Sequence, residues 1–191
     1  ACVGLQKMTY LPGHGVYEYP YTPESFPWFY DKEQWIKYLD MLVANRMNSL
    51  YLWNGHPFAS LVKLEDYPFA LEVDEETFKM NEEMFSFLTE EADKRGIFVI
   101  QMFYNIILSK PFAEHYGLRT QDRNRPITPL IADYTRKSIA AFIEKYPNVG
   151  LLVCLGEAMC TVEDDVEWFT KTIIPGVKAV SYTHLRAHET G

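Results

Sequence analysis

Four apolar, strand-like runs alternate along this chain with four amphipathic helical patterns, and this order restricts the possible folds more than any other feature of the sequence. The expected strands occupy residues 3–11, 48–53, 97–103 and 149–155. The expected helices occupy residues 31–46, 81–95, 129–146 and a segment that begins at residue 161. Because consecutive strand and helix units form parallel sheets with right-handed crossovers, the sequence predicts an α/β fold.

The helix predictions rest on apolar residues that recur at the spacing of helical turns. Asp31 is expected to cap the first helix and Gly96 to end the second. Thr161 is expected to cap the fourth helix, which Pro175 and Gly176 then kink or end. The predicted buried faces consist of Trp35, Leu39, Leu42 and Val43 in the first helix, Met84, Phe85, Leu88 and Ala92 in the second, Ile131, Ile139, Phe142, Ile143 and Tyr146 in the third, and Val166, Phe169 and Ile173 in the fourth.

The connections between these elements are unequal in length. Helix-to-strand turns have one to three residues, whereas the loops that follow the first three strands have about twenty or more, far above the usual two to six. Long loops at the carboxyl edge of a parallel sheet are where α/β enzymes place their sites. No glycine-rich nucleotide motif follows any strand. Four units are half of a (β/α)8 TIM barrel, so residues 1–180 are expected to be the N-terminal half of such a catalytic domain.

Composition supports one globular unit and excludes two kinds of partner. The chain has 191 residues, of which 48% are hydrophobic, and a net charge of −8. This charge, without a basic stripe, argues against nucleic acid. No apolar run of about 18 residues is present, so no membrane span is predicted. The chain begins at Ala1 rather than Met, and the sequence does not predict a compartment.

The last eleven residues, 181–191, resemble a translated sequencing adapter and are expected to be a non-native tail. Their histidines, His184 and His188, are therefore discounted as metal ligands. The three cysteines do not have the spacing of a zinc site or a disulfide framework, and Cys154 is expected to be an inert core residue. No metal or cofactor is predicted.

Glu157 is the strongest candidate for a catalytic group. It follows the apolar run 149–155, which is typical of a strand buried on both faces, and so lies just past the carboxyl end of that strand. An apolar strand end raises the pKa of a carboxyl group, as a general acid requires. The alternative is a surface glutamate that caps the next helix. Other acidic residues, including Glu72 in a charged run and Asp164 in the fourth helix, are expected to be solvated or structural.

Polar and aromatic residues in the long loops are candidates for binding a sugar. They are His14 after the first strand, Asn54 and His56 after the second, and Tyr104 and Asn105 after the third. Each histidine is equally compatible with a packed loop residue, and Trp53 and Tyr104 with plain core. The aromatic segment 17–30 is either a packed cover or a wall of stacking rings.

Four cations gather in the loop that follows the third strand: Lys110, Arg119, Arg123 and Arg125. Arginine forms paired hydrogen bonds with carboxylates, so Arg123 and Arg125 are candidates for holding an anionic sugar. A solvated loop face is the alternative.

One segment, 35–53 (W-I-K-Y-L-D-M-L-V-A-N-R-M-N-S-L-Y-L-W), resembles the first helix and second strand of the β-hexosaminidase and α-glucuronidase groups of glycoside hydrolases. Arg46-Met47-Asn48, followed by Leu50 and Leu52, carries the resemblance. It implies a TIM barrel in which the general acid is a glutamate at the end of the fourth strand, the position of Glu157. Hexosaminidases have an aspartate directly before that glutamate, where this chain has Gly156, so the resemblance favours enzymes acting on uronic acids or neutral sugars.

The resulting prediction is a glycoside hydrolase that acts on a polysaccharide or oligosaccharide, including one that contains uronic acid. Glycoside hydrolysis needs two carboxyl groups, and only Glu157 is a credible candidate here, so the second is expected outside this chain, which should be inactive alone. One alternative is a metal-dependent TIM-barrel isomerase or hydrolase with His14, His56 and Glu157 as ligands. Another is a non-catalytic carbohydrate-binding barrel.

Overall fold

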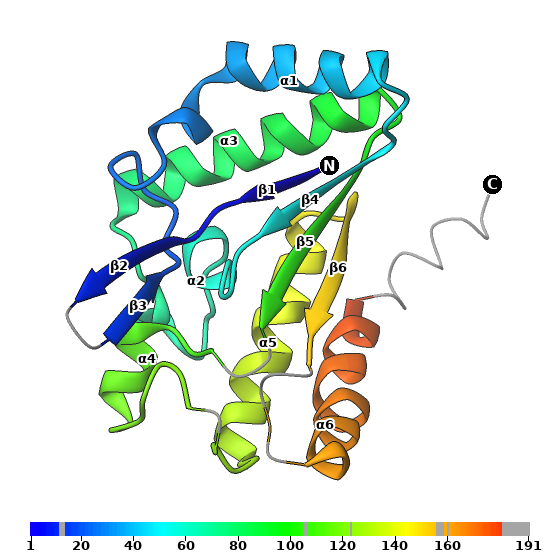
Figure 1. Ribbon diagram of the computed structural model, residues 1–191. Coiled ribbons are helices and arrows are strands. Elements are labelled where there is room, and N and C mark those ends of the chain that lie inside the picture. The colour runs from blue at the N-terminus through cyan, green and yellow to red at the C-terminus, as the bar shows by residue number, and fades with distance from the viewer. Residues whose placement is uncertain (12–13, 105–106, 123, 156–158, 160, 181–191) are drawn as a thin grey trace.

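The computed structural model describes residues 1–11, 14–104, 107–122, 124–155, 159 and 161–180. Its centre is a parallel sheet in the spatial order β1 (Cys2–Gly4), β4 (Ser49–Trp53), β5 (Phe98–Tyr104) and β6 (Val149–Cys154) (Figure 1). The order in space is the order along the chain, without the reversal at which a doubly wound sheet changes direction. The predicted α/β fold is confirmed, and the sequential order fits one part of a (β/α)8 barrel.

The first predicted strand, residues 3–11, is wrong in extent. Only Cys2–Gly4 pairs with β4, and the chain then forms a separate antiparallel hairpin of β2 (Lys7–Leu11) and β3 (His14–Glu18). The backbone N–H of Leu5 still donates to the carbonyl of Trp53 at 2.7 Å, and the chain leaves the parallel sheet after this contact. Alternation of polar and apolar residues indicates a strand but not its partner, so the pattern merged two strands into one.

The main helices alternate with the parallel strands along the chain, and shorter helical turns lie in the long loops. The helices are α1 (Lys32–Ala44), α3 (Glu75–Lys94), α5 (Pro129–Lys145) and α6 (Val162–Trp168). The loops contain η1 (Pro27–Tyr30), α2 (Phe58–Leu61), η2 (Pro68–Ala70) and α4 (Lys110–His115), and η3 (Phe169–Ile173) extends α6. Predicted caps are confirmed: Asp31 accepts from the N–H of Gln34 at 3.0 Å, and Gly96 ends α3 at a φ of 67°.

The second helix begins six residues earlier than predicted. Asp74 caps α3 by accepting a hydrogen bond from the N–H of Thr77 at 2.7 Å. Asn81 lies fully buried on the inward face of α3 and donates to the carbonyls of Tyr21 and Ser60 at 2.8 and 3.0 Å. A polar residue in the middle of the buried stripe interrupts the apolar periodicity, so the pattern placed the helix start too late.

The core fills the space between the sheet and one layer of helices. Side chains that alternate along the inner strands, such as Leu52, Val99 and Phe103, are buried in one large cluster with residues of α1, α3 and α5. The opposite face is more open, and Phe98 and Leu152 are 56% and 38% exposed there. Helices on one face only, together with the sequential strand order, are what a segment of a barrel wall has.

The prediction that the fourth strand is buried on both faces is therefore wrong. Within the described residues β6 pairs with β5 alone, and its residues are mostly half-buried or exposed. Cys154 is half-buried and free, rather than a core residue. An apolar run cannot distinguish a strand that is covered on both faces from one that lies at an edge.

The predicted apolar face of the fourth helix is only partly correct. Thr161 caps α6 as expected, but Val166 and Phe169 are 57% and 37% exposed, whereas Ile173 is buried. The five residues of η3 form a wide π-turn, which rotates the buried face away from the 3.6-residue spacing. Helical structure continues past Pro175 and Gly176 to residue 180, so these residues do not end the helix, which was one of the two expectations. In α1 the predicted face is also narrower, since Val43 is 46% exposed.

Candidate functional site at the carboxyl edge of the sheet

The four parallel strands run in the same direction and end at one edge of the sheet (Figure 1). Trp53 ends β4 beside Met102, and Tyr104 ends β5 beside Cys154. Of the predicted site residues, Asn54 and His56 directly follow β4, and Tyr104 is the last residue of β5. The structure therefore places these three at the edge at which α/β barrels carry their chemistry.

Asn54 holds three of these segments together. Its side chain is fully buried, and its amide nitrogen donates to the carbonyls of Leu5 and Tyr19 at 2.6 and 2.7 Å. Its side-chain oxygen accepts from the N–H of His56 at 2.8 Å. Both amide hydrogens are thereby used within the protein. These hydrogen bonds join the segment after β1 to the segment after β4.

His56 is also buried, at 3% exposure, in contact with aromatic rings. Its Nε2 lies 2.9 Å from the hydroxyl of Tyr134 on α5, and the two rings stack with centroids 5.9 Å apart. The ring of Phe58 meets it edge-on. Burial lowers the pKa of His56 to about 3, so the imidazole is neutral at physiological pH. The pair ties the segment after β4 to the helix before β6.

Tyr104 belongs to a small apolar cluster at the same edge. This cluster contains Ile107, which is buried, and the partly buried Tyr19, Tyr104 and Met159. The rings of Trp53 and Tyr104 meet edge to face with centroids 6.3 Å apart. The N–H of Tyr104 donates to the carbonyl of Gly55 at 2.9 Å. A Cβ at Gly55 would overlap the ring of Tyr19 and lie 2.8 Å from the Cδ1 of Ile107, so glycine lets these side chains pack against the backbone.

Arg125 lies half-buried in the loop that follows β5. Its Nη2 donates to the carbonyl of Arg119, and its Nε is buried without a hydrogen-bond partner among the described residues. Burial lowers the pKa of Arg125 below its usual value, which the nearby carboxylate of Asp122 partly opposes. The guanidinium is therefore partly desolvated, a state that strengthens its attraction for an anion.

Glu157, Asn105 and Arg123 lie outside the described residues. The backbone of His14 is in β3, paired with Leu11, and its side chain lies outside the description. Leu155 and Met159, which flank Glu157 in the sequence, both pack against the main core.

Two residues at this edge were missed by the sequence. The side chain of Glu72, predicted to be solvated, is half-buried, and its Oε1 accepts from the N–H of Lys110 at 2.7 Å. Burial raises the pKa of Glu72 to about 7, although the hydrogen bond from Lys110 opposes the shift. Tyr134 is buried on α5, and burial raises its pKa. Its ring stacks on the ring of Phe112 with centroids 4.0 Å apart. The pattern around Glu72 is that of a charged surface run and contains no signal for this contact.

The aromatic segment 17–30 is largely a packed cover. Tyr21, Phe26 and Phe29 are at most 5% exposed and lie in the main core. The hydroxyl of Tyr21 donates to the side chain of Gln101 on β5 at 3.3 Å, and its N–H donates to Ser60. Trp28, at 38% exposure, is the most open ring among those whose exposure is described in this segment.

Two further findings concern the described part of the chain. It contains no group of three or more histidine, cysteine or acidic side chains arranged to hold a metal ion. None of its helices is both long and apolar enough to cross a membrane.

Comparison with known proteins finds a similar solved structure. No protein-family model matches the sequence, and no curated protein is significantly similar to it. The solved structure is that of a protein described as a GH138 enzyme targeting pectin rhamnogalacturonan II, and GH138 is a group of glycoside hydrolases. The two chains are 85% identical and superpose with a TM-score of 0.90. The match covers 96% of this chain and 21% of the GH138 enzyme, so this chain spans about a fifth of the length of that protein.

Proposed function

We propose that this chain is part of a glycoside hydrolase that acts on a pectic polysaccharide containing uronic acid. The observation that carries the proposal is the 85% identity to the GH138 enzyme over 96% of the chain. The long loops at the carboxyl edge and the resemblance of residues 35–53 to glycoside hydrolases point to the same class independently. The narrower resemblance, to β-hexosaminidases and α-glucuronidases, stays a prediction.

Glu157 is the proposed general acid. Glycosidases protonate the leaving oxygen with one carboxyl group while a second acts as base or nucleophile about 5–9.5 Å away. Glu157 follows β6 by three residues in the sequence, and β6 ends at the edge shared by all four parallel strands. The second carboxyl group is proposed to come from a part of the longer enzyme that this chain does not contain.

The other site residues divide into two proposed roles. Tyr104 and Arg125, with His14, Asn105 and Arg123, are proposed to contact the sugar, the arginines through its carboxylate. Asn54 and His56 are proposed to act indirectly. Their hydrogen bonds are directed into the protein, so they support the loops that face the substrate.

Mutation of Glu157 tests the proposal. The assay uses a chimaera in which this chain replaces the matching segment of the GH138 enzyme, because the second carboxyl group is then present. General acids contribute about 10²–10⁴-fold to rate, so Glu157→Gln should lower kcat by that factor on pectic substrate. On aryl glycosides with an acidic leaving group the loss should be much smaller, because departure then needs little protonation.

Glu163→Gln is the matched control. Glu163 lies six residues further on, in the first turn of α6, and is exposed. It should leave both activities unchanged. Equal losses on both substrates for Glu157→Gln would argue against the acid role. Full activity of Glu157→Gln would favour a carbohydrate-binding role for this part of the chain.

A further inference from the structure

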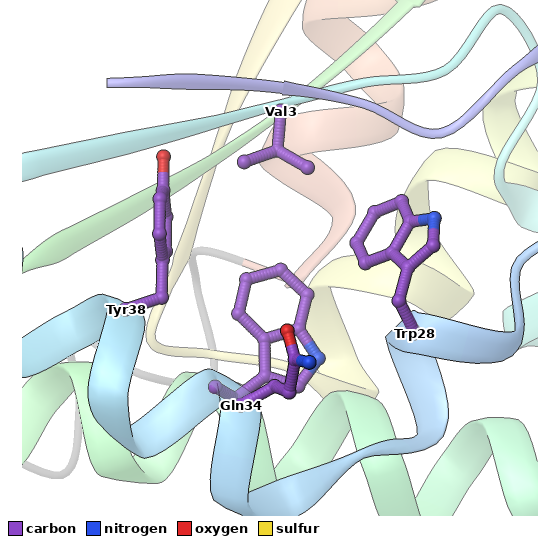
Figure 2. Close-up of a pocket in the computed structure, with 5 residues that line it drawn as sticks. Val3, Trp28, Gln34 and Tyr38 are labelled. Carbon is purple, nitrogen blue, oxygen red and sulfur yellow. The ribbon is translucent and has the colours of Figure 1, made fainter.

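An apolar pocket lies between β1 and α1, outside the carboxyl-edge site. It has a volume of about 270 Å³ and is lined by Val3, Trp28, Gln34, Trp35 and Tyr38. Figure 2 shows Val3 pointing from β1 toward α1, with Trp28 and Tyr38 on either side of it and Gln34 opposite. We call this the Val3 pocket.

The walls of the Val3 pocket are formed by rings packed on one another. Trp35 is 3% exposed and lies with ring centroids 5.8 Å from Trp28 and 6.0 Å from Tyr38. Its Nε1 donates to the carbonyl of Phe29 at 2.8 Å. Trp28 remains 38% exposed and Tyr38 is half-buried, so the walls are fixed while the pocket between them is open.

The pocket lies beside an unpaired sheet edge. Within the described residues β1 pairs with β4 alone, and α1 packs beside α3 on one side. Val3 is in register with Leu52, which is fully buried under the helix layer, whereas Val3 itself is only half-buried. On the side of β4, α3 packs beside α1 and against β5, whereas no further unit lies beside β1 within the described residues. A further unit beside β1 would place its helix over the Val3 pocket.

The lining and the charge of the chain restrict what can occupy the pocket. Among the described residues, no charged side chain lines it, and the amide side chain that does, Gln34, is exposed. It therefore lacks the converging polar groups of a small-molecule site. A second copy of this chain would carry the same net charge of −8, which opposes close association. An engineered cavity of about 150 Å³ holds benzene, so 270 Å³ suits one aromatic or two aliphatic side chains.

We propose that the Val3 pocket is an interface inside a longer polypeptide, where it receives apolar side chains from the helix that accompanies a further parallel strand beside β1. This chain matches 21% of the GH138 enzyme, so most of that protein lies outside the matched segment. The interface closes the sheet edge at β1 and buries the rings of Trp28 and Tyr38. It concerns assembly of the barrel and is independent of the proposed catalytic chemistry.

Filling the pocket tests this proposal. In the GH138 chimaera, Gln34→Phe places a ring at the pocket and competes with the proposed occupant, so Tm should fall by several degrees. Met41→Phe is the control, since Met41 lies on the same helix, is 43% exposed and does not line the pocket. It should shift Tm by less than the error between repeats. Equal Tm values for the two variants would overturn the proposal.

A second measurement does not depend on the variant folding. Acrylamide quenching of the unmodified chimaera, compared with its Trp28→Phe variant, gives the accessibility of Trp28. An occupied pocket shields this ring, so the difference in quenching should be close to zero. Quenching typical of an exposed indole would overturn the proposal. So would sedimentation showing that the chimaera forms a dimer that Gln34→Arg dissociates, because the occupant is then a second copy.

Discussion

Glu72 is the titratable residue at the candidate site whose raised pKa most directly couples folding to pH. Its Oε1 accepts from the N–H of Lys110 at the start of α4, and its own N–H donates to the carbonyl of Ala59 at 3.0 Å. The positive charge of Lys110 lowers the pKa of Glu72, against the effect of burial. The negative charge of Glu72 in turn raises the pKa of Tyr134. The contact joins the loop after β4 to the loop after β5.

The raised pKa of Glu72 predicts how stability changes with pH. The folded chain holds this proton up to about pH 7, whereas the ordinary value of the group is 4.5. Between these values the folded state binds more protons than the unfolded state, so the contribution to the free energy of unfolding is lost as pH rises toward 7. Urea unfolding should show the parent losing stability relative to Glu72→Gln over this range.

Glu76→Gln is the control for this titration, since Glu76 is an exposed carboxylate in the first turn of α3. The difference in stability between parent and Glu72→Gln should level off above about pH 7. A difference that stays constant from pH 4.5 to 7 would show that Glu72 titrates normally and is not buried by the loops around it.

At the residue scale the sequence located the edge of the site but not the direction of its side chains. Asn54 and His56 were predicted from their position after a strand, and both lie at that edge. Their hydrogen bonds to Leu5, Tyr19 and Tyr134 depend on segments up to 78 residues away. Local pattern contains no information on such distant partners. For the same reason it does not indicate that Glu72 is half-buried.

At the scale of elements, α5 supports the loops through Tyr134. Its hydroxyl lies 2.9 Å from Nε2 of His56, and its ring stacks on Phe112 of α4. Tyr134 thus contacts segments that follow two different strands. A substitution at Tyr134 is therefore expected to alter the shape of the site without removing a contact to the substrate.

Removal of one hydroxyl tests this support. Tyr134→Phe in the chimaera should lower kcat/KM several-fold on pectic substrate, because the segment that carries His56 and Asn54 loses its anchor on α5. Tyr146→Phe is the control, since Tyr146 is equally buried and its hydroxyl donates to the carbonyl of Leu61 at 3.2 Å. Both variants should lose about 1 kcal/mol of stability. If both lower kcat/KM equally, the effect is general destabilisation and the supporting role is wrong.

The sequence predicted the existence of the main elements better than their limits. All four helices and the four parallel strands are present. Each has a periodic apolar pattern, and apolar residues of these elements are packed in the main core. The errors occur where another part of the fold overrides the pattern. Part of the first predicted strand belongs to the hairpin β2–β3. The buried polar residue Asn81 interrupts the apolar pattern near the start of α3. The π-turn η3 shifts the buried face of the fourth helix away from the 3.6-residue spacing.

At the scale of the whole molecule, the chain is a parallel sheet with a helix layer on one face and two edges that have no partner within the described residues. Sequential strand order follows from four repeated units, and the sequence predicted it. Exposure of Leu152 and Phe98 was not predicted, because burial of a strand depends on neighbours that the local sequence does not specify. The division into a domain of residues 1–180 and a non-native tail of residues 181–191 stays a prediction.

Transfer of activity is the most direct measurement of the central claim. The chimaera, with this chain in place of the matching segment of the GH138 enzyme, is incubated with rhamnogalacturonan II, and the released sugars are quantified against the GH138 enzyme itself. If the chain forms part of the same kind of active site, the chimaera should release the same sugar at a rate within about tenfold, or 1.4 kcal/mol, of the GH138 enzyme. A chimaera that folds with the same circular dichroism spectrum but releases no sugar would contradict the assignment of this chain to a pectin-degrading glycoside hydrolase.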